Sequence, residues 1–173
     1  IARIDLAVIT NIGVAHIEQL GSKENILKEK LTIQDGLKAG GVLILNGDDL
    51  LLQTVKAKDG CHTVFYGTGE ACQYQAVDIR LENGYPQFIA VCRKDRQDKE
   101  PRRIPVSLHV LGRHQIWNAL AGLAVADHMG VPLEKAAKRL EEFGVVKNRH
   151  QIYELRDGLV LIDDTYNASP VSM

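Results

Sequence analysis

The sequence has no Gly-x-x-x-x-Gly-Lys-Ser/Thr segment, the glycine-rich loop with which many ATP-binding proteins hold the phosphates. Its nearest substitute, Gly67-Thr68-Gly69, is too short and contains no lysine. These 173 residues therefore do not grip a nucleotide's phosphates through such a loop. A nucleotide site in them must depend on other residues.

Cysteines and long apolar runs are also scarce. Cys61, Cys72 and Cys92 are odd in number and lack the spacing of a metal site, which favours reduced thiols in strands or in the core. No apolar run approaches the roughly 18 to 20 residues of a membrane span, and no basic-then-apolar leader is seen. We therefore expect a cytoplasmic protein with no membrane partner.

The sequence also has no excess of positive or negative charge. The 21 Lys and Arg residues nearly balance the 22 Asp and Glu residues, so the formal net charge is -1. Such a balance gives no general attraction to nucleic acid or to an anionic membrane. The densest charged run, residues 93–103, mixes both signs and favours a solvated loop over a binding patch. A small polar ligand must be held by local residues.

Continuous apolar runs are the main structural signal. Residues 6–9, 42–45 and 63–66 read as strands buried on both faces, as in a parallel sheet. A helix is predicted from Lys23, with Ser22 as N-cap, to near Gly36 or Gly40-Gly41, and a short helix should follow residues 46–49. This alternation predicts a doubly wound, mostly parallel α/β sheet.

The later part of the chain changes its pattern. Residues 72–110 predict a small antiparallel subsheet, packed on the parallel sheet, with Asn83-Gly84 as a hairpin turn. The remaining predicted elements are a buried helix at 114–129, a helix from Val131 with Pro132 at its first position to about Phe143, and strands at 151–154 and 159–162 around Asp157-Gly158. At this length we expect one main unit.

Lys30 stands out among the candidate functional residues. At 100° per residue it falls in the middle of an apolar stripe made by Ile26, Leu27, Leu31, Ile33 and Leu37. One interpretation is a lysine that extends along the core to reach water. The other is a desolvated amine in the wall of an active site, where burial favours the neutral, reactive form.

Polar residues also follow two of the predicted strands. His16 lies in the loop after the first strand, at the end of a parallel sheet where ligands bind, although a loop histidine can simply be exposed. Imidazole suits a divalent cation that bridges phosphates. Asp163 and Asp164 follow the last strand, where they could orient a ribose or attract a cation, or cap a helix.

The first turn of the predicted buried helix carries a side-chain amide. Gly112-Arg113-His114 opens that helix, and Asn118 could pair with both a donor and an acceptor of adenine, or make an ordinary helix-end hydrogen bond. Farther along, Arg149 is a candidate for clamping a terminal phosphate, because a guanidinium binds phosphate bidentately.

Four segments, in this order, resemble the Mur ligase family of ATP-dependent amide-forming enzymes. They are Thr10-Asn11-Ile12-Gly13-Val14-Ala15-His16, the helix with Lys30, Leu111-Gly112-Arg113-His114-Gln115-Ile116-Trp117-Asn118-Ala119-Leu120, and Ile162-Asp163-Asp164-Thr165-Tyr166-Asn167-Ala168-Ser169-Pro170. The last segment is most similar to the members that join D-Ala-D-Ala to UDP-N-acetylmuramoyl-tripeptide. Gln115 and Thr32 depart from a usual asparagine and a frequent glutamate without moving the register.

The resemblance implies roles for individual residues. His16 matches a histidine that binds magnesium, and Lys30 matches a lysine whose carbamylated side chain supports a second magnesium ion. Asn118 matches an asparagine that contacts adenine, Arg149 a phosphate-contacting arginine, and Asp164 an acid near the ribose. Further candidates for lining the nucleotide and substrate site are His114, Tyr166, Thr10 and Asn11.

The resemblance also implies a place in a larger protein. It assigns residues 1–155 to an incomplete central ATP-binding domain, and residues 156–173 to the connection and first strand of a C-terminal ligase domain. Both ends look cut, because the chain opens at Ile1 and stops at Met173 after a fresh strand-and-turn signal. We expect the phosphate loop, a magnesium-binding glutamate and the UDP-sugar domain before Ile1, and the D-Ala-D-Ala domain mostly beyond Met173.

The implied reaction uses ATP and two magnesium ions to convert the tripeptide carboxylate into an acyl phosphate, which the amine of D-Ala-D-Ala then attacks. We expect the 173-residue chain alone to be inactive and to associate with itself through an unpaired sheet edge. The alternatives are a sister Mur ligase, a folylpolyglutamate-type ligase, or a non-catalytic nucleotide-binding or interaction module. The segment Tyr166–Pro170 argues against the other ligases, and an immediate upstream start codon would favour the module.

Overall fold

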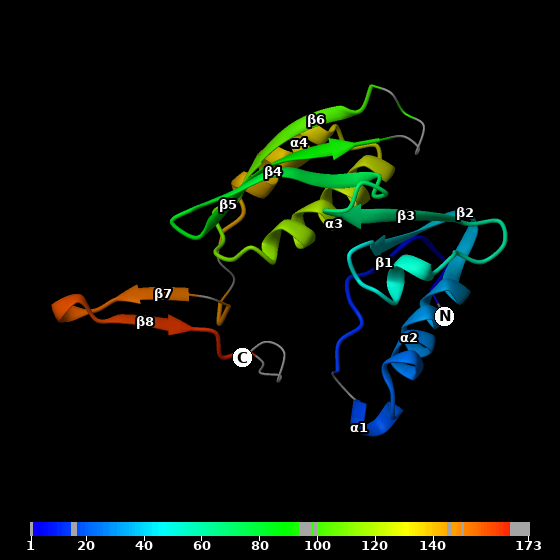
Figure 1. Ribbon diagram of the computed structural model, residues 1–173, viewed down its shortest axis with the longest axis horizontal. Coiled ribbons are helices and arrows are strands. Elements are labelled where there is room, and N and C mark those ends of the chain that lie inside the picture. Colours follow the sequence, from blue (N-terminus) through cyan, green and yellow to red (C-terminus); the bar gives the residue numbers. More distant parts are fainter. Residues whose placement is uncertain are drawn as a thin grey trace.

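The computed structural model describes residues 2–14, 17–93, 98, 100–144, 147–149 and 151–166. Six strands form one sheet in the order β1-β2-β3-β4-β5-β6, and β7 and β8 form a separate hairpin (Figure 1). The predicted mixed α/β architecture is confirmed. Among the described residues, no helix is long and apolar enough to cross a membrane.

The parallel part of the sheet arises from the predicted apolar runs. Its strands are β1 (Ile4–Ile9), β2 (Leu37–Asn46), β3 (His62–Gly67) and the start of β4 (Tyr74–Glu82). β4 pairs with β3 only through Tyr66↔Tyr74 and Gly67↔Gln75. Since β4 starts beside the end of β3, a short loop joins these parallel strands without a helical crossover.

The connection from β1 to β2 contains α1 (Ile17–Leu20) and α2 (Lys23–Leu31). Ser22 is the N-cap of α2, as predicted, and its side-chain oxygen accepts the Asn25 backbone N–H at 3.2 Å. The helix ends at Leu31 and continues as a 3-10 helix, η1 (Thr32–Gly36). The predicted α-helix was therefore too long at its C-terminal end.

The helix predicted after β2 is also shorter than expected. A single 3-10 turn, η2 (Leu52–Thr54), occupies that place. The Asp49 carboxylate accepts the backbone N–H groups of Leu51 and Leu52 at 3.0 and 3.1 Å, which starts the turn. The chain leaves the 3-10 turn at Val55, which has strand-like dihedral angles, and makes a further turn at residues 59–60 before β3.

The antiparallel part of the sheet consists of β4, β5 (Tyr85–Cys92) and β6 (Arg102–Ser107). Asn83 (φ 51°) and Gly84 (φ 85°) form the predicted two-residue hairpin turn. The prediction that this subsheet packs on the parallel sheet is wrong. One strand, β4, pairs with β3 on one side and β5 on the other, so both parts belong to a single continuous sheet.

Helices cover both faces of the sheet. β2 shows this directly, since Val42 and Ile44 pack towards α3 (Gln115–His128) and α4 (Leu133–Glu141), whereas Leu43 and Leu45 pack towards α2. Figure 1 shows α2 and the pair α3 and α4 on opposite sides. Helix α3 is buried, as its uniform apolar sequence predicted. Helix α4 begins at Leu133, later than predicted, so Pro132 is its N-cap and not its first helical residue.

The last described elements form a hairpin of β7 (Gln151–Glu154) and β8 (Val160–Asp163). Both strands and their turn, with Asp157 at φ 60° and Gly158 at φ 74°, match the prediction. The hairpin extends away from the six-stranded sheet (Figure 1). Its loop contains the boundary between residues 155 and 156 that the family resemblance implies.

Strand β1 lies at the edge of the sheet and, within the part of the chain that the structure describes, has β2 as its one strand neighbour. An edge strand offers backbone N–H and C=O groups to another chain. Self-association through this edge stays a prediction, and size-exclusion chromatography across concentrations would test it.

The three cysteines should differ in reactivity. Cys61 is half-buried, whereas Cys72 and Cys92 are buried, and burial raises the pKa of the Cys92 thiol to about 12, with the nearby Asp127 carboxylate adding to the shift. A thiol reagent at pH 8 should therefore modify Cys61 in the folded protein, and the other two cysteines after unfolding. A Cys61→Ser variant should lose the fast reaction, and a second fast thiol would contradict the prediction.

Candidate functional site

The loops at the carboxyl ends of the parallel strands are tied to one another. After β1, the Ile12 backbone N–H donates to Asp49 Oδ2 at 2.8 Å, and Asn46 Nδ2, at the end of β2, donates to the Thr10 carbonyl at 3.1 Å. Thr10 and Asn11 are exposed at this edge. In open α/β sheets this is the edge at which ligands bind.

Lys30 reaches the same edge from α2. Its Nζ atom donates to the Asn11 carbonyl at 2.8 Å, so the lysine lies against the loop after β1. The interpretation of Lys30 as a buried amine is wrong, however, because its side chain is exposed. Lys30 therefore lies beside the carboxyl edge of the sheet, without the desolvation that the sequence suggested.

The length of α2 explains the error. The predicted stripe assumed a regular α-helix through Ile33 and Leu37, which would have centred the apolar face near Lys30. Ile33 instead lies in the 3-10 helix η1 and Leu37 in β2. In the remaining helix Ile26 is buried and Leu27 and Leu31 are half-buried, so two of the five apolar residues predicted to surround Lys30 do not belong to this helix.

Asp48 connects this edge to α3. Its carboxylate accepts hydrogen bonds from the Trp117 indole Nε1 at 2.7 Å, from the Thr68 backbone N and hydroxyl at 2.8 and 2.9 Å, and from the Gly69 backbone N at 3.2 Å. Trp117 belongs to the first turn of α3, and Thr68 and Gly69 follow β3. One carboxylate therefore joins the loops after β2 and β3 to the start of the helix.

The predicted adenine-reading residues lie on that first turn. Asn118 Nδ2 donates to Gln115 Oε1 at 3.0 Å, and Gln115 Nε2 lies 3.1 Å from His114 Nε2. His114 and Asn118 are both exposed. The Asn118 contact is the helix-end hydrogen bond of the alternative interpretation, and it also orients the amide at the carboxyl edge.

Arg149 and Tyr166 lie together beside the β7–β8 hairpin. The guanidinium carbon of Arg149 is 4.0 Å from the centre of the Tyr166 ring, a cation–π contact, and the Tyr166 backbone N–H donates to the Asn148 carbonyl at 3.2 Å. Both side chains are exposed. The structure thus brings together two of the predicted ligand-binding residues.

The paired aspartates after β8 have different surroundings. Asp163 Oδ1 accepts the backbone N–H and the hydroxyl of Thr165 at 3.1 and 2.7 Å, a local contact in a part of the chain where the described residues contain no helix for it to cap. Asp164, the residue matched to the ribose contact, is exposed beside it. The segment from Asn167 onward lies outside the described residues.

Of the two expected magnesium ligands, the structure describes Lys30 and not His16. His16 lies outside the described residues, so its position is not part of the geometry. Among the described residues, no three His, Cys, Asp or Glu side chains gather as a metal ion would require. Lys30 remains the described member of the set, and its contact with Asn11 places it on the loop that leads towards His16.

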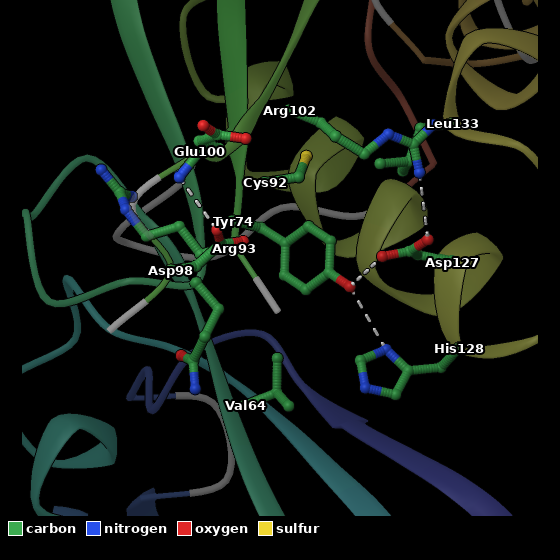
Figure 2. Close-up of a pocket in the computed structure, with 11 residues that line it drawn as sticks. Val64, Tyr74, Cys92, Arg93, Asp98, Glu100, Arg102, Asp127, His128 and Leu133 are labelled. Atoms are coloured by element: carbon green, nitrogen blue, oxygen red, sulfur yellow. Dashed lines mark hydrogen bonds and ion pairs between the residues drawn. The ribbon is translucent and has the colours of Figure 1, made fainter. Parts of the chain in front are cut away.

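A cavity of about 550 Å³ lies elsewhere, between the strand ends of the antiparallel part and the C-terminal end of α3 (Figure 2). Tyr74 Oη donates to Asp127 Oδ2 at 2.7 Å, and Figure 2 shows this hydroxyl pointing at Asp127 and His128. Arg102 donates to both Glu134 carboxylate oxygens at 3.0 Å.

The charges at this cavity compensate one another. Burial, and then the hydrogen bond to Asp127, raise the pKa of Tyr74 far above its ordinary value, so the phenol stays protonated. Arg102 and Glu134 satisfy each other as a surface ion pair. This cavity contains none of the predicted site residues. Its hydrogen bonds and ion pairs connect α3 and α4 to the sheet.

Three residues of the carboxyl edge escaped prediction as site residues: Asp48, Trp117 and Tyr66. The Tyr66 hydroxyl is fully buried and has no hydrogen-bond partner within the described residues, and burial together with the charges of Asp48 and Asp49 raises its pKa. The one available signal is the polar run 46–49 directly after a buried strand, and that run predicts only that a short helix follows.

The chain is similar in sequence to known proteins. Residues 1–126 match the family model described as the Mur ligase middle domain. The UDP-N-acetylmuramoyl-tripeptide–D-alanyl-D-alanine ligase of Bacillus subtilis is 39% identical over 173 residues, which cover 100% of this chain and 35% of that protein. The UDP-N-acetylmuramate–L-alanine ligase of Desulforamulus reducens is 30% identical over 161 residues, covering 92% and 34%.

Solved structures agree with these relatives. The crystal structure of MurF from Acinetobacter baumannii matches with a TM-score of 0.84 and 29% identity, over 98% of this chain and 36% of that one. MurF from Thermotoga maritima, crystallised in complex with ADP, matches with a TM-score of 0.76 and 26% identity, over 97% and 37%. The chain thus spans about a third of the length of the proteins it matches.

Proposed function

The chain belongs to the Mur ligase family, and on that premise we propose that it forms part of an ATP-dependent ligase that joins D-Ala-D-Ala to UDP-N-acetylmuramoyl-tripeptide in peptidoglycan precursor synthesis. The observation that carries the proposal is the 39% identity, along the whole chain, to a ligase named for that reaction. The gathering of Asn11, Lys30, Asp48 and Asn118 at or next to one sheet edge supports it.

An amide cannot form directly from a carboxylate, because the oxygen that must leave is a poor leaving group. In the proposed reaction the tripeptide carboxylate attacks the terminal phosphorus of ATP, giving an acyl phosphate and ADP. The amine of D-Ala-D-Ala then attacks the acyl carbon, and phosphate leaves through a tetrahedral intermediate. The enzyme's task is to position these groups and to stabilise their charge.

Each of the described site residues would have its own role in this reaction. Asn118, oriented by Gln115, would read adenine, and Asp164 would bind the ribose. Arg149, held against Tyr166, would bind a phosphate oxygen pair. His114 would line the nucleotide site beside Asn118. Thr10 and Asn11, whose carbonyls already accept hydrogen bonds from Asn46 and Lys30, would line the reacting end.

On the family resemblance, Lys30 and His16 would hold magnesium. A neutral lysine amine can capture carbon dioxide and become a carbamate, whose carboxylate is the oxygen ligand that magnesium prefers. The Lys30 amine is exposed, so burial does not favour its neutral form here, and the family resemblance carries the carbamate proposal. Bound there, two magnesium ions would supply charge neutralisation for the transferring phosphoryl group.

We further propose that residues 1–155 are part of the ATP-binding domain and that residues 156–173 lead into the domain that receives D-Ala-D-Ala. The reaction would take place in the cytoplasm, where ATP is available. The reduced cysteines are consistent with that compartment.

A panel of acceptors tests the proposal against its nearest competitor, the addition of L-alanine to UDP-N-acetylmuramate, which the 30% identity to that ligase keeps open. The complete protein that carries this chain should release phosphate from ATP with UDP-N-acetylmuramoyl-tripeptide and D-Ala-D-Ala together. Release that requires L-alanine and UDP-N-acetylmuramate instead would overturn the assignment. Release with neither pair would overturn the family function.

The 173-residue chain by itself should bind ATP poorly. It contains no Gly-x-x-x-x-Gly-Lys-Ser/Thr loop, and the backbone N–H groups of such a loop supply much of the phosphate affinity. Isothermal titration with ATP and magnesium should show no binding at micromolar concentrations. A micromolar dissociation constant would contradict the view that the missing loop dominates the affinity.

A further inference from the structure

We propose that Asp48 is a positioning residue for the nucleotide. Its carboxylate holds the first turn of α3, and with it Asn118, against the carboxyl edge of the sheet. The inference rests on the proposed function, since it concerns the ATP site of that ligase. It goes beyond the residues that the family resemblance singled out, none of which is Asp48.

Four hydrogen-bond donors meet at the Asp48 carboxylate. Oδ2 accepts from Trp117 Nε1 and from the backbone N and hydroxyl of Thr68, and Oδ1 accepts from the Gly69 backbone N. Hydrogen bonds to an ionised carboxylate are shorter and stronger than neutral ones. Since Trp117 directly precedes Asn118, the orientation of the adenine-reading amide depends on where Asp48 holds the indole.

The backbone around Asp48 leaves room for this carboxylate. Gly67 has φ 157°, and a Cβ atom placed there would lie 2.7 Å from Asp48 Oδ1. Any side chain at position 67 would therefore displace the carboxylate. The Asp48 backbone N–H donates to Asn46 Oδ1 at 3.0 Å, and Asn46 in turn donates to Thr10. The same short chain of contacts thus links the adenine end of the site to the loop beside Lys30.

The exposure of Asp48 favours a geometric role over a stabilising one. The side chain lies at the surface, where water competes for each of its hydrogen bonds and their net contribution to stability is small. A contact that adds little to folding but fixes three segments at a ligand-binding edge acts mainly on the placement of those segments. Loss of Asp48 should therefore affect nucleotide binding more than folding.

The other end of α3 offers a matched control. Asp127 also accepts a hydrogen bond from an aromatic side chain at 2.7 Å, that of Tyr74, and also fixes α3 to the sheet. It lies about nine residues from Asn118 along the helix, beside the compensated cavity of Figure 2. Asp127→Asn makes the same chemical change as Asp48→Asn without touching the first turn.

Steady-state kinetics of the complete protein test the inference. Asp48→Asn should raise the KM for ATP about tenfold while the KM for D-Ala-D-Ala stays within about twofold. It should also narrow the preference for ATP over GTP, because Asn118 no longer meets the base at a fixed angle. Asp127→Asn should leave both KM values and the ATP preference unchanged, and lower the thermal midpoint instead.

A second variant, Trp117→Phe, tests the same inference if Asp48→Asn does not fold. Trp117→Phe keeps the ring and removes one hydrogen bond to Asp48, and it should raise the KM for ATP about threefold. An unchanged KM for ATP in both variants, or an equal rise in Asp127→Asn, would overturn the inference. An inactive wild-type protein would overturn the proposed ligase function, so the two failures are distinct.

Discussion

Replacement of Lys30 by alanine should lower the turnover of the complete ligase by about 100- to 1,000-fold while the protein remains folded. Lys30 is exposed and its described contact is one hydrogen bond to the Asn11 carbonyl, so its removal costs little stability. The proposed carbamate, in contrast, cannot form without the amine. Phosphate release measured with saturating D-Ala-D-Ala reports the loss, and circular dichroism reports the fold.

Two controls separate a carbamate from a simple positive charge. Lys28→Ala, on the same helix and also exposed, should keep full activity. Acetate added to Lys30→Ala should restore part of the turnover, because a small carboxylate can enter the space that the side chain vacates. Rescue by ethylamine rather than acetate would mean that Lys30 acts as an ammonium, and it would contradict the carbamate.

Replacement of Leu120 by alanine should lower the free energy of unfolding by about 3 kcal/mol. Leu120 is fully buried on α3 and packs in the cluster that joins this helix to β2, β3 and β4. Removing its side-chain carbons leaves a cavity that rigid strands on one side and α4 on the other cannot close. Urea unfolding followed by circular dichroism measures the change.

Leu50→Ala is the matched control, because Leu50 is 79% exposed in the turn after β2. It makes the same chemical change and should alter the unfolding free energy by less than about 0.5 kcal/mol. If Leu120→Ala were as mild as Leu50→Ala, α3 would not form the centre of the core.

Much of this fold could be predicted because its signals are local. The apolar runs at β1, β2 and β3, the Ser22 cap, the Asn83-Gly84 turn and the uniform apolar sequence of α3 each specify an element without reference to distant residues. Parallel strands buried on both faces leave a simple pattern in sequence. The order of the elements then suggested a ligand edge.

What escaped prediction depends on contacts between distant segments. The apolar stripe predicted around Lys30 loses Ile33 and Leu37 because α2 gives way to a 3-10 helix at Thr32, and helix ends are the least certain part of a periodicity argument. The continuity of the sheet follows from β4 pairing on both sides. Asp48 and Trp117 are 69 residues apart, and their hydrogen bond has no sequence signature.

Isotope transfer from the tripeptide carboxylate to phosphate distinguishes a ligase that forms an acyl phosphate from an enzyme that only hydrolyses ATP. With both oxygens of the tripeptide carboxylate labelled as ¹⁸O, the complete protein should release phosphate that carries one ¹⁸O atom, in step with D-Ala-D-Ala addition. The bridging oxygen of an acyl phosphate comes from the carboxylate and departs with phosphate when the amine attacks. Unlabelled phosphate, released at the same rate without D-Ala-D-Ala, would mean that water attacks ATP and that no ligase of this kind is present.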